Sequence, residues 1–190
     1  MRRLLIMITA IVVFAGCNSG KKNNTDEGIK KDGNNATTTT TSVPDRPSGK
    51  IDIESFGPLK LGQHVAETRQ AIGPPGATAK PVEWAADGMM HEDWNWFSYG
   101  LLLNMSYDKT NKDATLAIFS ITAEIPCDFK TKAGMGIGSS YAEVEATYKK
   151  DIDPEATDKT QITVGSVYGG IIFSFTNDKV SKVFLGAQAE

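Results

Sequence analysis

The sequence predicts an α+β domain built as a tandem repeat: a helix followed by three antiparallel strands occurs twice, forming one sheet with helices on one face. Three observations support this fold class. Residues 57–67 are similar to residues 133–143, each copy continues into a short amphipathic helix pattern, and each helix pattern precedes apolar stretches of period two. We assign repeat 1 of the domain to residues 51–125 and repeat 2 to residues 126–190.

The two predicted helices begin and end differently. Ser140 and Glu143 have the spacing of a capping box, whereas His64 occupies the equivalent position in the first copy, where we interpret it as a weak cap. Residues 73–76, Gly-Pro-Pro-Gly, end the first helix. The predicted apolar stripes are Val65, Thr68 and Ile72 in the first copy and Tyr141, Val144 and Tyr148 in the second.

Three strands are predicted after each helix, which gives a sheet of about six strands. Asn104 and Ser106 alternate with apolar neighbours, so we expect them to face away from the core. The last strands are predicted over residues 115–123 and 180–185. The inward positions of the other strands are Trp94, Trp96, Leu101, Leu103 and Met105 in the first copy and Ile162, Val164, Ile171, Phe173 and Phe175 in the second.

Residues 1–16 have the pattern of a lipoprotein signal peptide, with two arginines, a short apolar run and small residues before Cys17. This end resembles a bacterial lipobox, although Phe14 replaces the usual aliphatic residue. The resemblance implies a lipid, such as palmitate, on Cys17 and a lipid-anchored protein of the cell envelope. Asn18 after the cysteine resembles lipoproteins that are sorted to an outer membrane, whereas in a cell with a single membrane the protein would stay on the plasma membrane. The sequence leaves open whether it faces the periplasm or the exterior. An ordinary cleaved signal is the alternative, and residues 4–13 are too few to span a bilayer.

Residues 17–50 are predicted to form the lipidated cysteine and a disordered tether, because they are rich in Asn, Gly, Lys and Thr and lack aromatic residues. As a flexible coil this segment would reach about 30 Å. The chain has a formal net charge of −3, and the residues after the tether are more acidic still. This charge excludes the electrostatic footprint of a nucleic-acid-binding protein.

Catalytic and metal-binding patterns are weak. Cys127 is the only cysteine besides Cys17, and we interpret it as a small apolar residue, with a nucleophile assisted by His91 or a carboxylate as the alternative. His91, Glu92 and Asp93 are possible metal ligands, but neighbours on a strand point to opposite faces. We therefore predict no catalytic residue, metal or cofactor.

Residues 59–75, and residues 134–148 less closely, carry a Gly-containing apolar stretch, a short helix with an early acidic residue, and in the first copy a Gly-Pro after it. This pattern resembles the β-lactamase inhibitor protein fold and the small outer-membrane assembly lipoproteins of the SmpA/OmlA type. The resemblance implies protein binding across an exposed sheet face and no catalysis.

The aromatic tract of residues 84–99 is the best candidate for a binding surface. We predict Trp84, Phe97 and Tyr99 as contacts for an envelope protein, whereas Trp94 and Trp96 are either core or interface. The sequence thus favours a non-enzymatic macromolecule-binding module. An envelope hydrolase using Cys127 and a purely structural scaffold are the alternatives, and the oligomeric state is left open.

Overall fold

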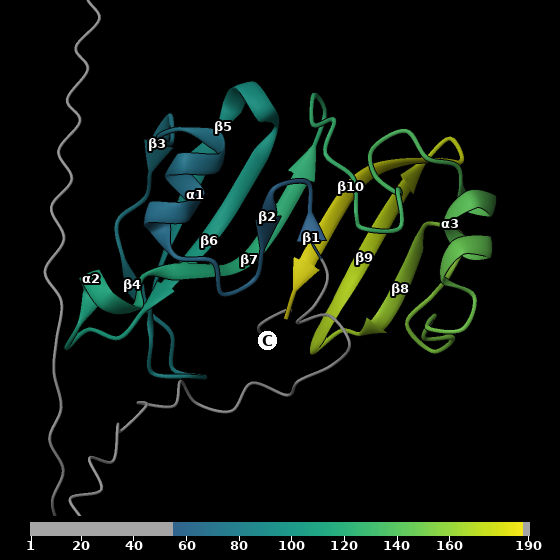
Figure 1. Ribbon diagram of the computed structural model, residues 1–190. Coiled ribbons are helices and arrows are strands. Elements are labelled where there is room, and N and C mark those ends of the chain that lie inside the picture. The colour runs from purple at the N-terminus through teal and green to yellow at the C-terminus, as the bar shows by residue number, and fades with distance from the viewer. Residues whose placement is uncertain (1–54, 188–190) are drawn as a thin grey trace, which may run out of the picture. The chain divides into compact units, whose positions relative to one another are not determined.

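The computed structural model describes residues 55–187, which form ten strands and three α-helices (Figure 1). The predicted signal peptide, Cys17 and the tether lie outside the described residues. No helix within 55–187 is long and apolar enough to cross a bilayer. The elements are β1 Ser55–Phe56, β2 Leu59–Lys60, α1 Val65–Ile72, β3 Ala77–Thr78, β4 Val82–Glu83, β5 Met90–Trp96, the 3₁₀ turn η2 Phe97–Tyr99, β6 Leu101–Tyr107, α2 Lys112–Thr115, β7 Ala117–Glu124, α3 Tyr141–Tyr148, β8 Gln161–Ser166, β9 Gly169–Thr176 and β10 Lys179–Gly186.

An eight-stranded antiparallel sheet organises the described residues. Its order is β3-β5-β6-β7-β10-β9-β8, with β4 also paired to β5, and β1 and β2 form a separate two-stranded sheet. Strands β5, β6 and β7 follow one another in sequence and in space, as do β8, β9 and β10. The pairing of β7 with β10 joins the two sets.

The predicted fold class is wrong. The described residues are mostly β, and the two segments assigned as repeats have unlike contents, so no tandem repeat of a helix and three strands is evident. Residues 55–125 contain seven strands with α1, α2 and η2, whereas residues 126–187 contain α3 and three strands. In the second copy, Gly134 lies in a bend, Gly138 lies in a turn, and Gly136 forms an isolated bridge with Lys130.

The core lies on one face of the sheet. One row of paired residues crosses six strands, and all six side chains are buried: Trp94, Leu103, Ile121, Leu185, Ile171 and Val164. Helix α1 contacts this face through a hydrogen bond of 3.1 Å from Trp96 Nε1 to the Gly73 carbonyl. Helix α3 contacts the same face, where the Tyr148 and Phe173 rings lie 5.6 Å apart. Both helices therefore cover the face that carries the row.

The helix ends follow local sequence signals. Ser140 and Glu143 form the predicted capping box, with the Ser140 backbone N–H donating to Glu143 Oε2 at 2.7 Å. Gly73 ends α1 with a φ of 76°, a conformation that glycine adopts without steric cost. His64 stands at the N-cap of α1 but makes no capping hydrogen bond through its side chain.

The two core tryptophans provide a matched pair for a stability measurement. Trp96 Nε1 donates to the Gly73 carbonyl, whereas the buried Trp94 Nε1 has no hydrogen-bond partner. We expect Trp96→Phe to lower the free energy of unfolding by about 1–3 kcal/mol more than Trp94→Phe, because only the first leaves a carbonyl unpaired. Urea denaturation followed by circular dichroism measures both; equal losses would contradict the assigned hydrogen bond.

The capping box makes α3 sensitive to acid. Hydrogen bonds from the Ser140 backbone N–H, and then from its hydroxyl, hold the pKa of Glu143 below its ordinary value of 4.5. A lowered folded-state pKa contributes stability that is present above the ordinary value and is lost as the pH falls through the folded-state pKa.

We therefore expect Glu143→Gln to destabilise the protein at neutral pH and to show a smaller further loss than wild type on acidification. Denaturant titrations at a series of pH values test this, with Glu145→Gln on the same helix as control. Asp108 and Asp158 also have lowered pKa values, so the comparison rests on the difference between variants.

Candidate functional site

The face of the sheet opposite α1 and α3 carries a mixture of polar and aromatic side chains, and we call it the open face. Because side chains alternate along a strand, His91, Asn104 and Phe184 lie on the open face, on the other side of the sheet from the buried row. The segment of residues 153–158 contacts its β8 margin, since Thr163 Oγ1 donates to the Ala156 carbonyl at 2.7 Å. The partly or fully exposed members on β5, β6, β7 and β10 include Asp93, Asn95, Leu102, Asn104, Ser106, Ala117, Phe119, Thr122, Glu124, Lys182 and Phe184.

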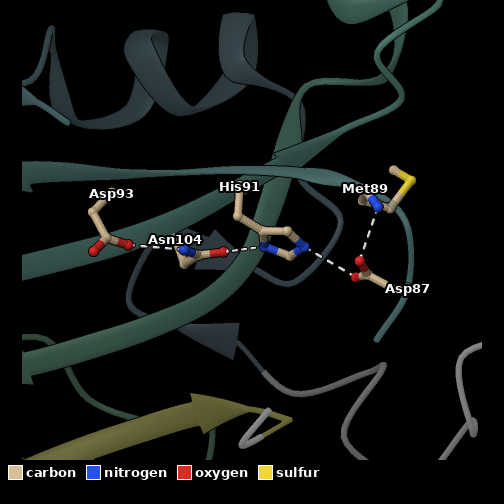
Figure 2. A network of polar contacts seen from close by, with 5 residues as sticks. All are labelled: Asp87, Met89, His91, Asp93 and Asn104. Carbon is tan, nitrogen blue, oxygen red and sulfur yellow. Dashed lines mark hydrogen bonds and ion pairs between the residues drawn. The ribbon is translucent and has the colours of Figure 1, made fainter. Parts of the chain in front are cut away.

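A chain of hydrogen bonds runs across this face around His91, which is 2% exposed (Figure 2). His91 Nδ1 lies 2.7 Å from Asn104 Oδ1, and Asn104 Nδ2 donates to Asp93 Oδ1 at 2.8 Å. His91 Nε2 lies 3.0 Å from Asp87 Oδ2, while the other oxygen of Asp87 accepts from the Met89 backbone N–H at 2.9 Å. The imidazole is thus held at both nitrogens.

Aromatic rings enclose the same imidazole. The Trp84 ring stacks on His91 with centroids 3.7 Å apart and planes 6° from parallel. Phe119 meets His91 edge to face at 4.7 Å and Trp84 at 5.6 Å. The register between β6 and β7 shifts between the pairs Asn104–Ser120 and Met105–Ile118. Phe119 is the extra residue of β7 at this bulge, and its ring therefore lies on the open face. We call Trp84, Asp87, His91, Asp93, Asn104 and Phe119 the His91 cluster.

The hydrogen bonds of the cluster fix the positions of its side chains. The carboxylate of Asp93 can only accept, so it fixes the Asn104 amide with its oxygen toward His91. Both ring nitrogens of His91 therefore lie within hydrogen-bond distance of a side-chain oxygen. Ser106 lies opposite His91 in the strand register, while both imidazole nitrogens lie close to other side chains, Asn104 and Asp87.

Cys127 has the properties of a buried structural thiol. It is 5% exposed, and burial raises its pKa, which favours the unreactive thiol. His91 directs its nitrogens to Asp87 and Asn104, and His64 is exposed at the start of α1. The structure thus gives no support to the alternative in which Cys127 acts as a nucleophile with His91.

The possible metal ligands divide between the two faces of β5. His91 and Asp93 lie on the open face, whereas Glu92 is buried on the core face and forms an ion pair of 2.9 Å with Lys112. The hydrogen bond to Glu92 is the main reason why the pKa of Lys112 is raised. Within residues 55–187, no group of three or more His, Cys, Asp or Glu side chains is placed to hold a metal ion.

The predicted binding residues lie at opposite ends of β5. Trp84 lies beside the first residues of the strand, where its backbone N–H donates to the Met89 carbonyl, and its ring is half-buried. Phe97 and Tyr99 follow the last residue of the strand and are 66% and 38% exposed. A strand of seven residues spans about 20 Å, so these residues do not form one continuous contact.

The two remaining tryptophans of the aromatic tract are core residues. Trp94 is 4% exposed and Trp96 is 2% exposed, and their rings lie 6.0 Å apart beneath α1. The alternative in which they belong to an interface is therefore wrong for the described structure. Their alternation with His91, Asp93 and Asn95 places those polar residues on the open face.

Comparison with protein-family models, with curated proteins and with solved structures finds no match for this chain. The resemblance to the β-lactamase inhibitor protein fold and to the SmpA/OmlA type therefore stays a prediction. Asp87 and Asn104 are functional candidates that the sequence did not single out, because the strand register and the β4–β5 turn bring them to His91.

Removing the central amide tests the cluster. We expect Asn104→Ala to lower the free energy of unfolding by about 1–3 kcal/mol, because it leaves a buried nitrogen of His91 without its partner. Ser106→Ala on the same strand and face is the control and should cost less. Chemical denaturation measures both variants, and a loss in Asn104→Ala no greater than in the control would contradict the network.

Proposed function

We propose that this protein is a lipid-anchored module of the cell envelope that binds another macromolecule through the open face, without catalysis. The observation that carries the proposal is the His91 cluster, in which hydrogen bonds and stacked rings fix aromatic and polar side chains on the face opposite the helices. Rigid aromatic side chains beside satisfied polar groups are typical of the central contacts of protein interfaces.

The composition of the open face also favours binding to a protein. Leu102, Phe119 and Phe184 are partly exposed and alternate with Asn and Thr side chains, so the face offers apolar area and hydrogen-bonding groups together. Asp93, Glu124 and Lys182 add charges of both signs to the same face, and Lys182 forms an ion pair with Glu124. A protein surface of mixed character fits this face better than a polyanion does.

The anchor part of the proposal comes from the sequence. Arg2, Arg3 and a short apolar run precede Cys17, which we propose as the lipidated first residue of the mature chain. We propose the outer membrane as the location because Asn18 follows this cysteine. Trp84 remains in the proposed contact, at the end of the open face where its ring stacks on His91.

Site-specific photo-cross-linking in cells tests the binding face. We expect a benzophenone amino acid at Asn95 or Thr122, both half-exposed on the open face, to give a discrete adduct with one envelope protein. The same probe at Glu67 or Gln70, exposed on α1, is the matched control and should give none. Adducts from neither face, or equally from both, would reject the open face as the contact.

Metabolic labelling with an alkyne fatty acid tests the anchor separately. Wild type should carry the label and Cys17→Ser should not. Equal labelling of the two chains would remove the anchor from the proposal and leave the cross-linking result to decide the binding function.

A further inference from the structure

Exposed apolar side chains gather at one end of the sheet. Phe97, Tyr99 and Ile125 are 66%, 38% and 77% exposed, and we call them the apolar end patch. Phe97 and Tyr99 belong to η2, between β5 and β6, and Ile125 follows the end of β7, so all three lie at the same ends of neighbouring strands (Figure 1).

The backbone holds the parts of this patch together. The Glu124 backbone N–H donates to the Gly100 carbonyl at 2.9 Å, and the Gly100 N–H donates to the Phe97 carbonyl at 3.2 Å. Gly100 has a φ of 59°, and a Cβ at this position would lie 3.0 Å from the Ile125 carbonyl carbon and closer still to Glu124. Only glycine fits here, so η2 is fixed against the residues that follow β7.

The described chain begins close to the patch. The Tyr99 ring lies 5.7 Å from the Phe129 ring, which lies 6.4 Å from the ring of Phe56, one residue after the start of the described chain. The Gly57 N–H also donates to the Lys130 carbonyl at 2.8 Å. The first described residues of the chain therefore lie near the Tyr99 side of the apolar end patch, separated from Tyr99 by the Phe129 ring.

We propose that the apolar end patch docks on the lipid bilayer to which Cys17 is attached, an inference that rests on the proposed lipid anchor. A single acyl chain gives only marginal membrane attachment, and a second contact strengthens it. Aromatic side chains are favoured at the interface between headgroups and hydrocarbon. The connection to Cys17 keeps the patch at a high local concentration near the bilayer, so a modest apolar contact suffices.

Docking at this end also orients the binding face. The His91 cluster lies at the start of β5 and the patch at its end, so bilayer contact at Phe97 and Ile125 directs Trp84 away from the lipid. The ion pair of Lys182 with Glu124 supplies opposite charges near the patch. The contact with lipid is therefore predicted to be apolar and insensitive to salt.

Fluorophore accessibility on phosphatidylcholine vesicles tests the proposal. The chain isolated from membranes carries Cys127→Ser and one new cysteine, either Ile125→Cys in the patch or Tyr168→Cys as the matched control. Tyr168 is 60% exposed, in the β8–β9 turn at the opposite end of the sheet. We expect the label at Ile125 to be shielded from an aqueous quencher and the label at Tyr168 to stay accessible, at low and high salt.

Flotation of the same samples separates the anchor from the patch. Flotation with equal accessibility of the two labels means that the anchor holds and the patch does not dock, which overturns the proposal. Shielding at Ile125 in a chain with Cys17→Ser supports the patch and shows that its docking does not need the anchor. No flotation of either chain overturns both.

A substitution pair gives a second measurement. In the Cys17→Ser chain, Phe97→Asn with Ile125→Asn should lower the partition into vesicles by about tenfold. In the lipidated chain, the same pair should lower the shielding of a label at Tyr99→Cys by about tenfold. Val82→Asn with Tyr168→Asn, at positions 59% and 60% exposed, should change neither quantity. Equal effects of the two pairs, or shielding of the patch by a second copy of the chain without vesicles, would overturn the proposal.

Discussion

The pairing of β7 with β10 determines where every other feature of the described domain lies. This ladder joins strands β5, β6 and β7 to strands β8, β9 and β10, and its register places Ile121 opposite Leu185 and Ala123 opposite Val183. Side chains alternate between faces along a strand, so a slip of one residue would turn the apolar side chains of one of the two strands to the solvent face. The apolar row across the sheet therefore fixes the register, and the register fixes which residues form the open face.

Local signals in the sequence identified much of the secondary structure. The capping box at Ser140 and Glu143, the end of α1 at Gly73 and the inward positions of β6 were all readable, because each depends on spacing within a few residues. The two-residue strands β3 and β4 and helix α2 were missed, since segments this short have no periodicity. Pairing with β5 determines the conformation of β3 and β4.

The tandem repeat failed for a related reason. The apolar positions of the two copies are separated by similar numbers of residues, which shows that both segments suit strands. This similarity does not exclude additional elements between those strands in one copy. Residues 77–89 contain β3, β4 and the turn that carries Asp87, and residues 151–160 contain no corresponding strands. The turn within this inserted segment carries Asp87, which contacts His91. The segment that has no counterpart in the second copy therefore forms part of the candidate site.

The edges of the sheet favour the open face over strand addition as the route of the proposed recognition. The segment before β8 occupies its outer backbone groups, since Gly165 donates to the Asp151 carbonyl and Asp153 donates to the Thr163 carbonyl. At the other edge β3 and β4 are two residues long and Pro81 lies directly before β4, which disfavours the addition of a further strand. Because neither edge offers a long free ladder, a partner gains most by contacting the face on which the stacked rings of Trp84 and His91 lie.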